Sequence, residues 1–296
     1  MADGALSGVR PLGYSLAFAR AGGIRPHRGL IFFGIKRRAT WRLRSGRRLV
    51  DSSSSDTTSS LGRAEALVPR CNFCQATEFN DYAGRSAEQC SKCRSLARHR
   101  VALEVYTRRE LFTKRPGGVR VLHFAPEACL HDKISPVLEG GYVCSDSRPE
   151  AYKKMQCLRL TLPDGLSIFP EGYFDYVIHN HVLEHIPGTF RDHILPVCRI
   201  LKPGGMTIFS VPGPQVDAPI TIEGGEHLPD DAERVRKFGQ ADHVRRFGRD
   251  LLEFMESLPN GRFTKDDLTD RDRAGISVKP RSNSVLIWAK QRPDGN

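Results

Sequence analysis

The stretch that decides the fold is Gly172–Pro212, which reads GYFDYVIHNHVLEHIPGTFRDHILPVCRILKPGGMTIFSVP. It opens with a short apolar run at 173–178, rich in β-branched and aromatic residues. Such a run is typical of a strand buried on both faces of a parallel sheet. The polar cluster His179-Asn180-His181 follows where that strand would end.

A helix and a second strand complete this unit. Apolar residues recur at helical spacing on one face of the segment that follows, at Phe190, Ile194, Cys198 and Leu201. The sequence Lys202–Gly205 predicts the end of the helix, and 206–211 predicts another buried strand. Pro196 predicts either a kink or a helix start. Strand, helix and strand form a βαβ unit, which indicates a parallel sheet.

A second candidate strand, 142–146, ends in the carboxylate of Asp146. In doubly wound sheets, ligands bind at the carboxyl ends of the strands, and an acid after the second strand accepts hydrogen bonds from ribose hydroxyls. The alternative is that Asp146 only begins a turn. The segment 119–124 predicts a further strand before it, and 284–289 predicts a closing strand.

Four of the eight cysteines are paired by spacing. The pattern is C-x2-C, fifteen residues, then C-x2-C, formed by Cys71, Cys74, Cys90 and Cys93. Two such knuckles supply four thiolates for a tetrahedral Zn²⁺ site with no open position, so the metal is expected to be structural. A pair of redox dithiols is the alternative. The other cysteines lie among apolar residues and suit a reducing compartment.

The stretch FDYVIHNHVLEHI followed by RILKPGGMTIFSVP resembles the fourth strand, following helix and fifth strand of class I S-adenosylmethionine-dependent methyltransferases. Cysteine knuckles, a basic helix start at 94–100, VLHFAPE and NHVLEH, in this order over 71–247, resemble a narrower bacterial family that carries an N-terminal four-cysteine zinc ribbon. The resemblance implies an α/β fold. It consists of a Rossmann-like, mostly parallel sheet with an antiparallel closing strand, preceded by the ribbon.

The same resemblance implies where the cofactor binds. Methyltransferases carry a Gly-x-Gly loop after the first strand, but the loop 123–129 has no glycine. Leu158 stands where many relatives carry an acid near the adenine. Glu127 is expected to bind the amino group of the methionine part. The expected contacts of S-adenosylmethionine are Phe124, Ala125, Pro126, Glu127, Asp146, Asn180 and His181.

The segment 213–249 resembles the insertion that covers the active site in the family. We expect His243 to act as a proton acceptor there, since an unperturbed imidazole titrates near neutral pH, and Arg245 to hold an acidic group of the acceptor. His185 is a competing base. In the alternative interpretation, Asp242 and Arg245 form a salt bridge and His243 is solvated.

The net charge of +11 is concentrated in the N-terminal leader. Residues 1–50 hold eleven Lys and Arg against Asp3 alone, so the rest is close to neutral. Charge therefore does not favour nucleic acid as a partner, although it does not exclude it. The leader, 1–66, has the composition of a disordered segment, and the alternatives are a misassigned start codon, a transit peptide or a segment that binds an anionic surface. The apolar run at 30–35 is too short to span a membrane.

We therefore expect a cytoplasmic S-adenosylmethionine-dependent methyltransferase with structural Zn²⁺, with organellar targeting left open. Its expected organisation is a basic leader (1–66), a zinc ribbon (67–100) and a methyltransferase domain (101–296). The acceptor is unidentified, and a small molecule or glycan is favoured. One alternative is an RNA methyltransferase that reads RNA through the ribbon. Another is a non-catalytic scaffold with a decayed cofactor loop, which cofactor binding would distinguish.

Overall fold

The computed structural model describes residues 67–113, 118–138, 140–213, 218–280 and 282–293. All of these belong to one compact unit, 63–296. The predicted leader, 1–66, lies outside the described residues. Among the described helices, none combines the length and the hydropathy needed to cross a membrane.

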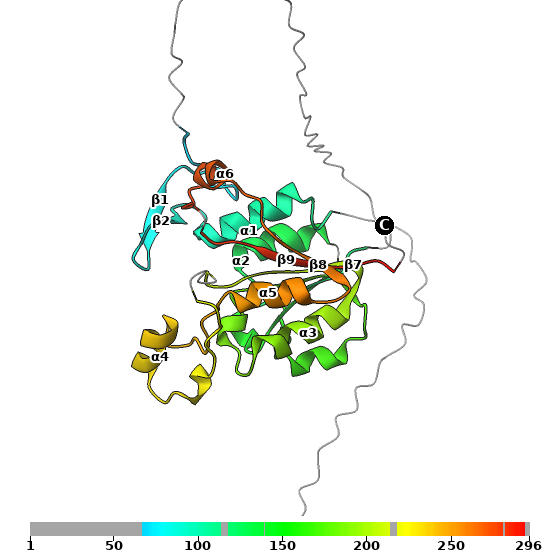
Figure 1. The fold of residues 1–296 in the computed structure, drawn as a ribbon. Helices are drawn as coiled ribbons and strands as arrows, with labels where there is room; N and C mark the ends of the chain where they lie inside the picture. The colour runs from blue at the N-terminus through cyan, green and yellow to red at the C-terminus, as the bar shows by residue number, and fades with distance from the viewer. Residues whose placement is uncertain (1–66, 114–117, 139, 214–217, 281, 294–296) are drawn as a thin grey trace, which may run out of the picture. The chain divides into compact units, whose positions relative to one another are not determined.

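A seven-stranded sheet forms the centre of this unit, in the order β5-β4-β3-β6-β7-β9-β8. Figure 1 shows this sheet with helices packed around it. The first five strands in this order run parallel, and β9 is antiparallel to both of its neighbours. The mostly parallel sheet with an antiparallel closing strand is thus confirmed. The strands are β3 (Val121–Phe124), β4 (Tyr142–Asp146), β5 (Leu158–Arg159), β6 (Phe174–Asn180), β7 (Leu201–Ser210), β8 (Gly261–Lys265) and β9 (Leu286–Lys290).

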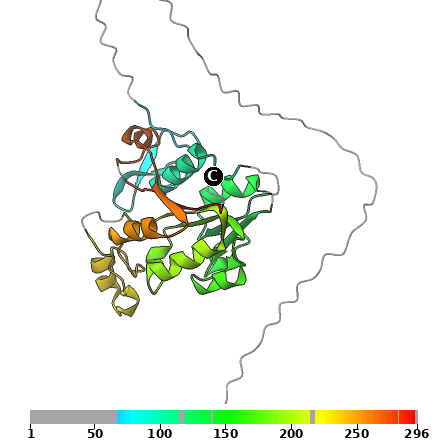
Figure 2. The same cartoon turned by 45° about the vertical axis from the view of Figure 1, so that its right-hand side comes forward.

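Helices cover both faces of the sheet, as the turned view also shows (Figure 2). Buried side chains of α1 and α2 form a core with one face of the sheet, and those of α3 and α5 form a core with the other face. The helices are α1 (Ala97–Arg108), α2 (Ala128–Ile134), α3 (Phe190–Ile200), α4 (Asp231–Phe238), α5 (Asp250–Ser257) and α6 (Asp270–Gly275). Short 3₁₀ turns are η1 (Ser135–Val137), η2 (Pro149–Ala151), η3 (Asp164–Ile168), η4 (Leu183–His185) and η5 (Gly225–His227).

Strand β6 lies in the middle of the sheet, and the apolar run explains why. Tyr176 and Ile178 pack into the core of α1 and α2, while Val177 packs into the core of α3 and α5. Successive side chains of a strand point to opposite faces, so a central strand covered on both faces needs an almost continuous apolar run.

The boundary between α3 and β7 differs from the sequence prediction. Helix α3 ends at Ile200, and β7 begins directly at Leu201, so the segment Lys202–Gly205 belongs to the strand and does not stop the helix. The pairing with β6 shifts register across this segment, where Gly204 has a φ of +79°. Pro196 lies inside α3, which Thr189 caps by accepting a hydrogen bond from the Asp192 amide at 3.2 Å.

The cysteine knuckles flank a two-stranded antiparallel hairpin, β1 (Phe79–Tyr82) and β2 (Arg85–Cys90). Its turn places Ala83 and Gly84 at φ values of +49° and +74°. Two consecutive positive φ values are typical of the tight turns that suit the twist of a hairpin.

Arg100, in α1, links this hairpin to a distant part of the chain. Its fully buried guanidinium donates to the backbone carbonyls of Ser95 and Ile276 at 2.8 and 2.7 Å. It also donates to the carbonyls of Glu88 and Ser277 at 3.2 and 2.8 Å. The basic residues at the start of α1 indicate a solvated face, packing onto the following domain or an anion contact, and Arg100 takes the second of these roles.

Candidate functional site

The loop after β3 approaches the sheet edge without a glycine. Ala125 adopts a φ of +46°, in the left-handed region, and its amide donates to the Ser145 carbonyl at 2.8 Å. Phe124 and Ala125 line a cavity at the carboxyl ends of the parallel strands, whereas Pro126 is buried and is not among the lining residues. A small residue in the left-handed region brings the backbone close to the cavity, as glycine does in other proteins.

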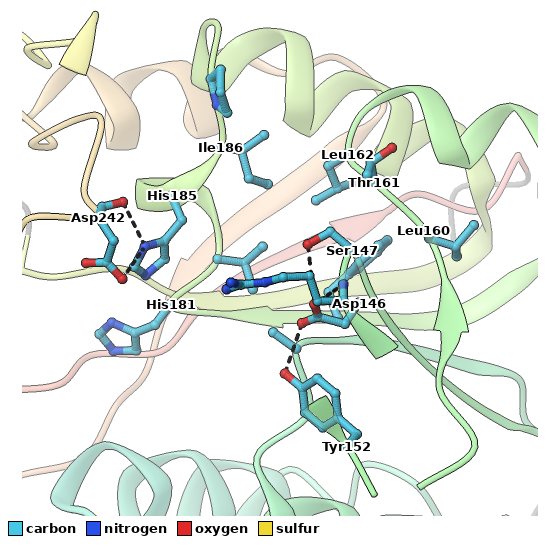
Figure 3. Close-up of a pocket in the computed structure, with 15 residues that line it drawn as sticks. Asp146, Ser147, Tyr152, Leu160, Thr161, Leu162, His181, His185, Ile186 and Asp242 are labelled. Atoms are coloured by element: carbon cyan, nitrogen blue, oxygen red, sulfur yellow. Dashed lines mark hydrogen bonds and ion pairs between the residues drawn. The ribbon is translucent and has the colours of Figure 1, made fainter. Parts of the chain in front are cut away.

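Asp146 ends β4 and is held in a fixed orientation (Figure 3). The Arg148 amide donates to one carboxylate oxygen at 2.7 Å, and the Tyr152 hydroxyl donates to the other at 2.9 Å. Both Tyr152 and Arg148 line the cavity beside Asp146. The carboxylate is therefore positioned at the cavity wall by two of its neighbours in the same loop.

The cluster at the end of β6 divides between the cavity and the core. His181 lines the cavity, while Asn180 is buried beneath it. The Asn180 amide donates to the Tyr106 hydroxyl at 3.2 Å and accepts from Ser210 at 3.3 Å. Asn180 therefore fastens α1 and β7 to the end of β6, and a direct contact with the cofactor stays a prediction.

The cavity has a volume of about 630 Å³, within the range of small-molecule sites. Leu160, Thr161 and Leu162, from the segment after β5, form its apolar side. Leu158, the position expected near the adenine, is 42% exposed and is not among the lining residues. Figure 3 shows Asp146 and Tyr152 across the cavity from His181, His185 and Asp242.

Glu127 begins the turn into α2 and pairs with His123 of β3. Its carboxylate lies 3.1 Å from His123 Nε2, and His123 Nδ1 lies 2.7 Å from the Tyr142 hydroxyl. Burial raises the pKa of Glu127, but the hydrogen bond and the charge of His123 outweigh burial and lower that pKa to about 2. Glu127 is thus an anion next to the loop, although it is not among the cavity-lining residues.

Two segments close the cavity opposite Asp146: the turn η4 and part of the 213–249 insertion. His185 lines the cavity, and its Nδ1 lies 3.1 Å from the Asp242 carbonyl oxygen and 3.4 Å from the Asp242 carboxylate. The Val244 amide donates to the Glu184 carbonyl at 2.8 Å, which holds the insertion against η4. Of the residues in the insertion, Asp242 reaches the cavity wall.

His243 and Arg245 lie behind that wall. His243 is only 4% exposed, so the alternative of a solvated His243 is wrong. Its ring meets that of His185 edge to face, with centroids 4.8 Å apart. Arg245 is buried and donates to the carbonyls of Ile186 and Gly188, each at 2.6 Å, and lies 3.6 Å from Glu223. Neither is among the cavity-lining residues, so their roles toward an acceptor stay predictions.

The four thiols of the knuckles converge. Cys71 and Cys93 have their sulfurs 3.5 Å apart, and those of Cys74 and Cys90 are 3.6 Å apart. All four sulfurs lie within 4.8 Å of one another. Sulfurs bound tetrahedrally at about 2.3 Å from one Zn²⁺ stand about 3.8 Å apart, so the residues fit this metal.

Sequence reasoning missed Tyr152, Arg148 and Glu184. Tyr152 and Arg148 follow Asp146 in a loop with no recognisable motif, and only the three-dimensional structure shows that they orient the carboxylate. Glu184 lies in the NHVLEH motif, between two histidines that line the cavity, and its buried position was not apparent from the motif.

Comparison with known proteins agrees with this architecture. The family model described as "Methyltransferase domain" matches residues 144–209, which span β4 to β7. The sequence matches none of the curated proteins with which it was compared.

Solved structures also resemble the chain. A SAM dependent methyltransferase from Archaeoglobus fulgidus is 14% identical, with a TM-score of 0.43 over 66% of this chain and 94% of that one. The 1,6-didemethyltoxoflavin-N1-methyltransferase of Burkholderia thailandensis, solved with S-adenosylhomocysteine, is 15% identical, with a TM-score of 0.39 over 66% and 78%. The family match runs from β4 to β7, so this part of the sheet has the sequence pattern of a methyltransferase domain.

Proposed function

We propose that this methyltransferase binds S-adenosylmethionine in the 630 Å³ cavity and transfers its methyl group to a small molecule or a glycan. The observation that carries the proposal is Asp146, a carboxylate fixed at the end of β4 on the cavity wall. In this proposal it accepts hydrogen bonds from the ribose hydroxyls. The loop Phe124–Glu127 and His181 contact the methionine part.

In methyl transfer from S-adenosylmethionine, the main task of the protein is to position the two reactants. The methyl group of a sulfonium is already activated, so the main requirement is to hold the acceptor atom in line with the methyl carbon. The apolar side formed by Leu160 and Leu162 suits the adenine, in place of the acid that Leu158 does not supply. Asp242 and His185 face the space left for the acceptor.

We further propose that 67–100 is a ribbon folded around one structural Zn²⁺, held by Cys71, Cys74, Cys90 and Cys93. Four thiolates complete the tetrahedral shell, so this ion has no position open for substrate. The ribbon supports the remainder of the chain through Arg100. The domain that follows, 101–296, carries the cofactor site.

Calorimetry with S-adenosylmethionine and S-adenosylhomocysteine tests the cofactor site. Asp146→Ala should weaken binding by roughly 1.5–3 kcal/mol, the usual value of hydrogen bonds to a charged group. Tyr152→Phe removes only the orienting hydroxyl, so it should cost about 0.5–1.5 kcal/mol. Asp164→Ala, in η3 and outside the cavity lining, is the matched control. Wild-type protein that binds neither compound would favour the scaffold alternative, and unchanged affinity in Asp146→Ala would remove Asp146 from the site.

A further inference from the structure

A second group of side chains with metal-binding donor atoms lies remote in sequence from the cysteine knuckles, and one of its members, His185, lines the cavity. Glu184 and His185 belong to η4, and His243 comes from the insertion. One donor atom from each of the three lies within 4.8 Å of the other two. This group combines two imidazoles with one carboxylate, a set typical of sites for divalent transition metals.

Hydrogen bonds fix which nitrogen of each imidazole is available. His185 Nδ1 lies 3.1 Å from the Asp242 carbonyl oxygen, and His243 Nδ1 lies 3.2 Å from the Phe238 carbonyl oxygen. A carbonyl oxygen can only accept, so Nδ1 carries the proton in each ring and the lone pair of a neutral ring is on Nε2. Metal-binding histidines commonly have this arrangement, in which a carbonyl or carboxylate orients the ring.

Glu184 supplies an oxygen that the protein leaves unsatisfied. The residue is 1% exposed, and Oε1 lies 3.0 Å from His181 Nδ1. Among the described residues, Oε2 has no hydrogen-bond partner. A buried carboxylate oxygen without a partner is costly, and a cation at that point would satisfy it.

We propose that Glu184, His185 and His243 bind one divalent transition-metal cation at the cavity wall. Donors on one ion at about 2.1 Å stand at most about 4.2 Å apart, so binding requires at most a small contraction of the cluster. His185 can supply it, because its side chain is 37% exposed while Glu184 and His243 are fixed by packing. The Asp242 carboxylate, 3.4 Å from His185 Nδ1, lies on the side of the ring opposite Nε2 and helps to orient the imidazole toward the ion.

A metal ion at this site would determine which class of acceptor binds. This step rests on the proposed function, methyl transfer from S-adenosylmethionine bound in the cavity. With three protein ligands, the ion keeps positions open toward the cavity. An acceptor that offers a hydroxyl group, with a second oxygen to chelate the ion, would bind there. The ion lowers the pKa of the bound hydroxyl, so neither histidine has to act as a base.

The transfer is then a simple substitution. The hydroxyl proton passes to water, and the acceptor oxygen forms a bond to the methyl carbon of S-adenosylmethionine. The carbon–sulfur bond breaks, and its electron pair stays on sulfur, which becomes the neutral thioether of S-adenosylhomocysteine. The methylated acceptor oxygen is a weaker ligand than the alkoxide, which favours release.

A titration of Mn²⁺ into the full chain tests the site. Electron paramagnetic resonance measures the concentration of free Mn²⁺ at each step. Mn²⁺ prefers nitrogen and oxygen donors over thiolates, so it reports this site while the cysteine ribbon keeps its zinc. We expect saturable binding of about one equivalent. Glu184→Gln, which preserves the shape of a buried side chain, and His185→Ala should each weaken binding at least about tenfold.

His227→Ala is the matched control, since this histidine lies in the same insertion with its side chain 83% exposed. Its Mn²⁺ affinity should equal that of the wild type, and thermal melts should show that each variant is folded. Absence of saturable binding in the wild type, or equal affinity in Glu184→Gln and His185→Ala, would overturn the site. S-adenosylmethionine calorimetry before and after the addition of Mn²⁺ separates the two proposals, because cofactor binding does not require this ion.

Discussion

The Arg100 guanidinium donates a hydrogen bond to the Ile276 carbonyl oxygen at 2.7 Å, across a separation of 176 positions in the chain. The same side chain donates to carbonyls of Ser95 and Glu88, next to the cysteine knuckles. The buried guanidinium of Arg100 therefore joins the ribbon, α1 and the segment after α6.

Replacing Arg100 should destabilise the whole unit. Arg100→Ala leaves several buried carbonyls without donors, so we expect a loss of at least about 3 kcal/mol in the free energy of unfolding. Arg100→Lys keeps the charge but loses the planar fork, so its loss should be intermediate. Urea denaturation measures both. Lys92→Ala changes an exposed residue of the same ribbon, and its free energy of unfolding should stay within about 0.5 kcal/mol of the wild type. An equally small change for Arg100→Ala would contradict the proposed role of Arg100.

Purified protein should contain about one equivalent of zinc in the ribbon, because four converging thiolates form one tetrahedral site. Cys90→Ser should release the zinc and lower the free energy of unfolding by more than about 4 kcal/mol, as loss of a structural metal does. Cys198→Ser, in α3, is the control and should retain the zinc. Elemental analysis and thermal melts measure the two effects. A zinc-free preparation with an unchanged melting temperature would count against the site.

Stability should fall in acid partly because of Glu127. Its pKa is about 2 in the folded protein against an ordinary 4.5, so the folded state favours the charged form. This contribution is fully present above about pH 4.5 and is lost as the pH falls toward 2, and it is on the order of 3 kcal/mol at neutral pH. Glu127→Gln should therefore show a flatter decline of stability between pH 5 and pH 2, roughly the window of the two pKa values. Equal slopes for wild type and variant would show that the pair with His123 contributes nothing.

Ala125 should tolerate glycine and reject a branched side chain. A left-handed φ costs an L-residue about 1–2 kcal/mol, and the extra chain entropy of glycine offsets about 0.5–1 kcal/mol of that. Ala125→Gly should thus be neutral or stabilise by up to about 1 kcal/mol, with cofactor affinity retained. Ala125→Val should destabilise. Ala128→Gly, three positions later in α2, is the control and should lower the free energy of unfolding by about 0.5–1 kcal/mol. If Ala125→Gly lowered the free energy of unfolding as Ala128→Gly does, backbone strain at Ala125 would be excluded.

The elements predicted best are those whose cause lies within a few residues. The run at 173–178 predicts a strand buried on both faces, and β6 is that strand. Asp146 could be placed at the sheet edge because the carboxyl ends of parallel strands meet there. The cysteine spacing predicts convergence of four thiols in the same way.

What the sequence did not reveal depends on contacts between distant residues. Two of the acceptors of Arg100, Ile276 and Ser277, lie far along the chain, so the sequence alone could not identify them. The position of His243 depends on how the insertion folds back on η4, through the bond from the Val244 amide to the Glu184 carbonyl. Local patterns identified the residue types of the cavity but not which of them reach its surface.

The link from Arg100 to Ile276 and Ser277 also constrains how the chain folds during synthesis. The knuckles and α1 leave the ribosome long before residues 276 and 277, so the guanidinium stays hydrated until those residues have emerged. Domains usually fold in order from the N-terminus as they emerge. Here the ribbon can complete its contacts through Arg100 only after residues 276 and 277 have been made, so it docks later than its place in the order of synthesis suggests.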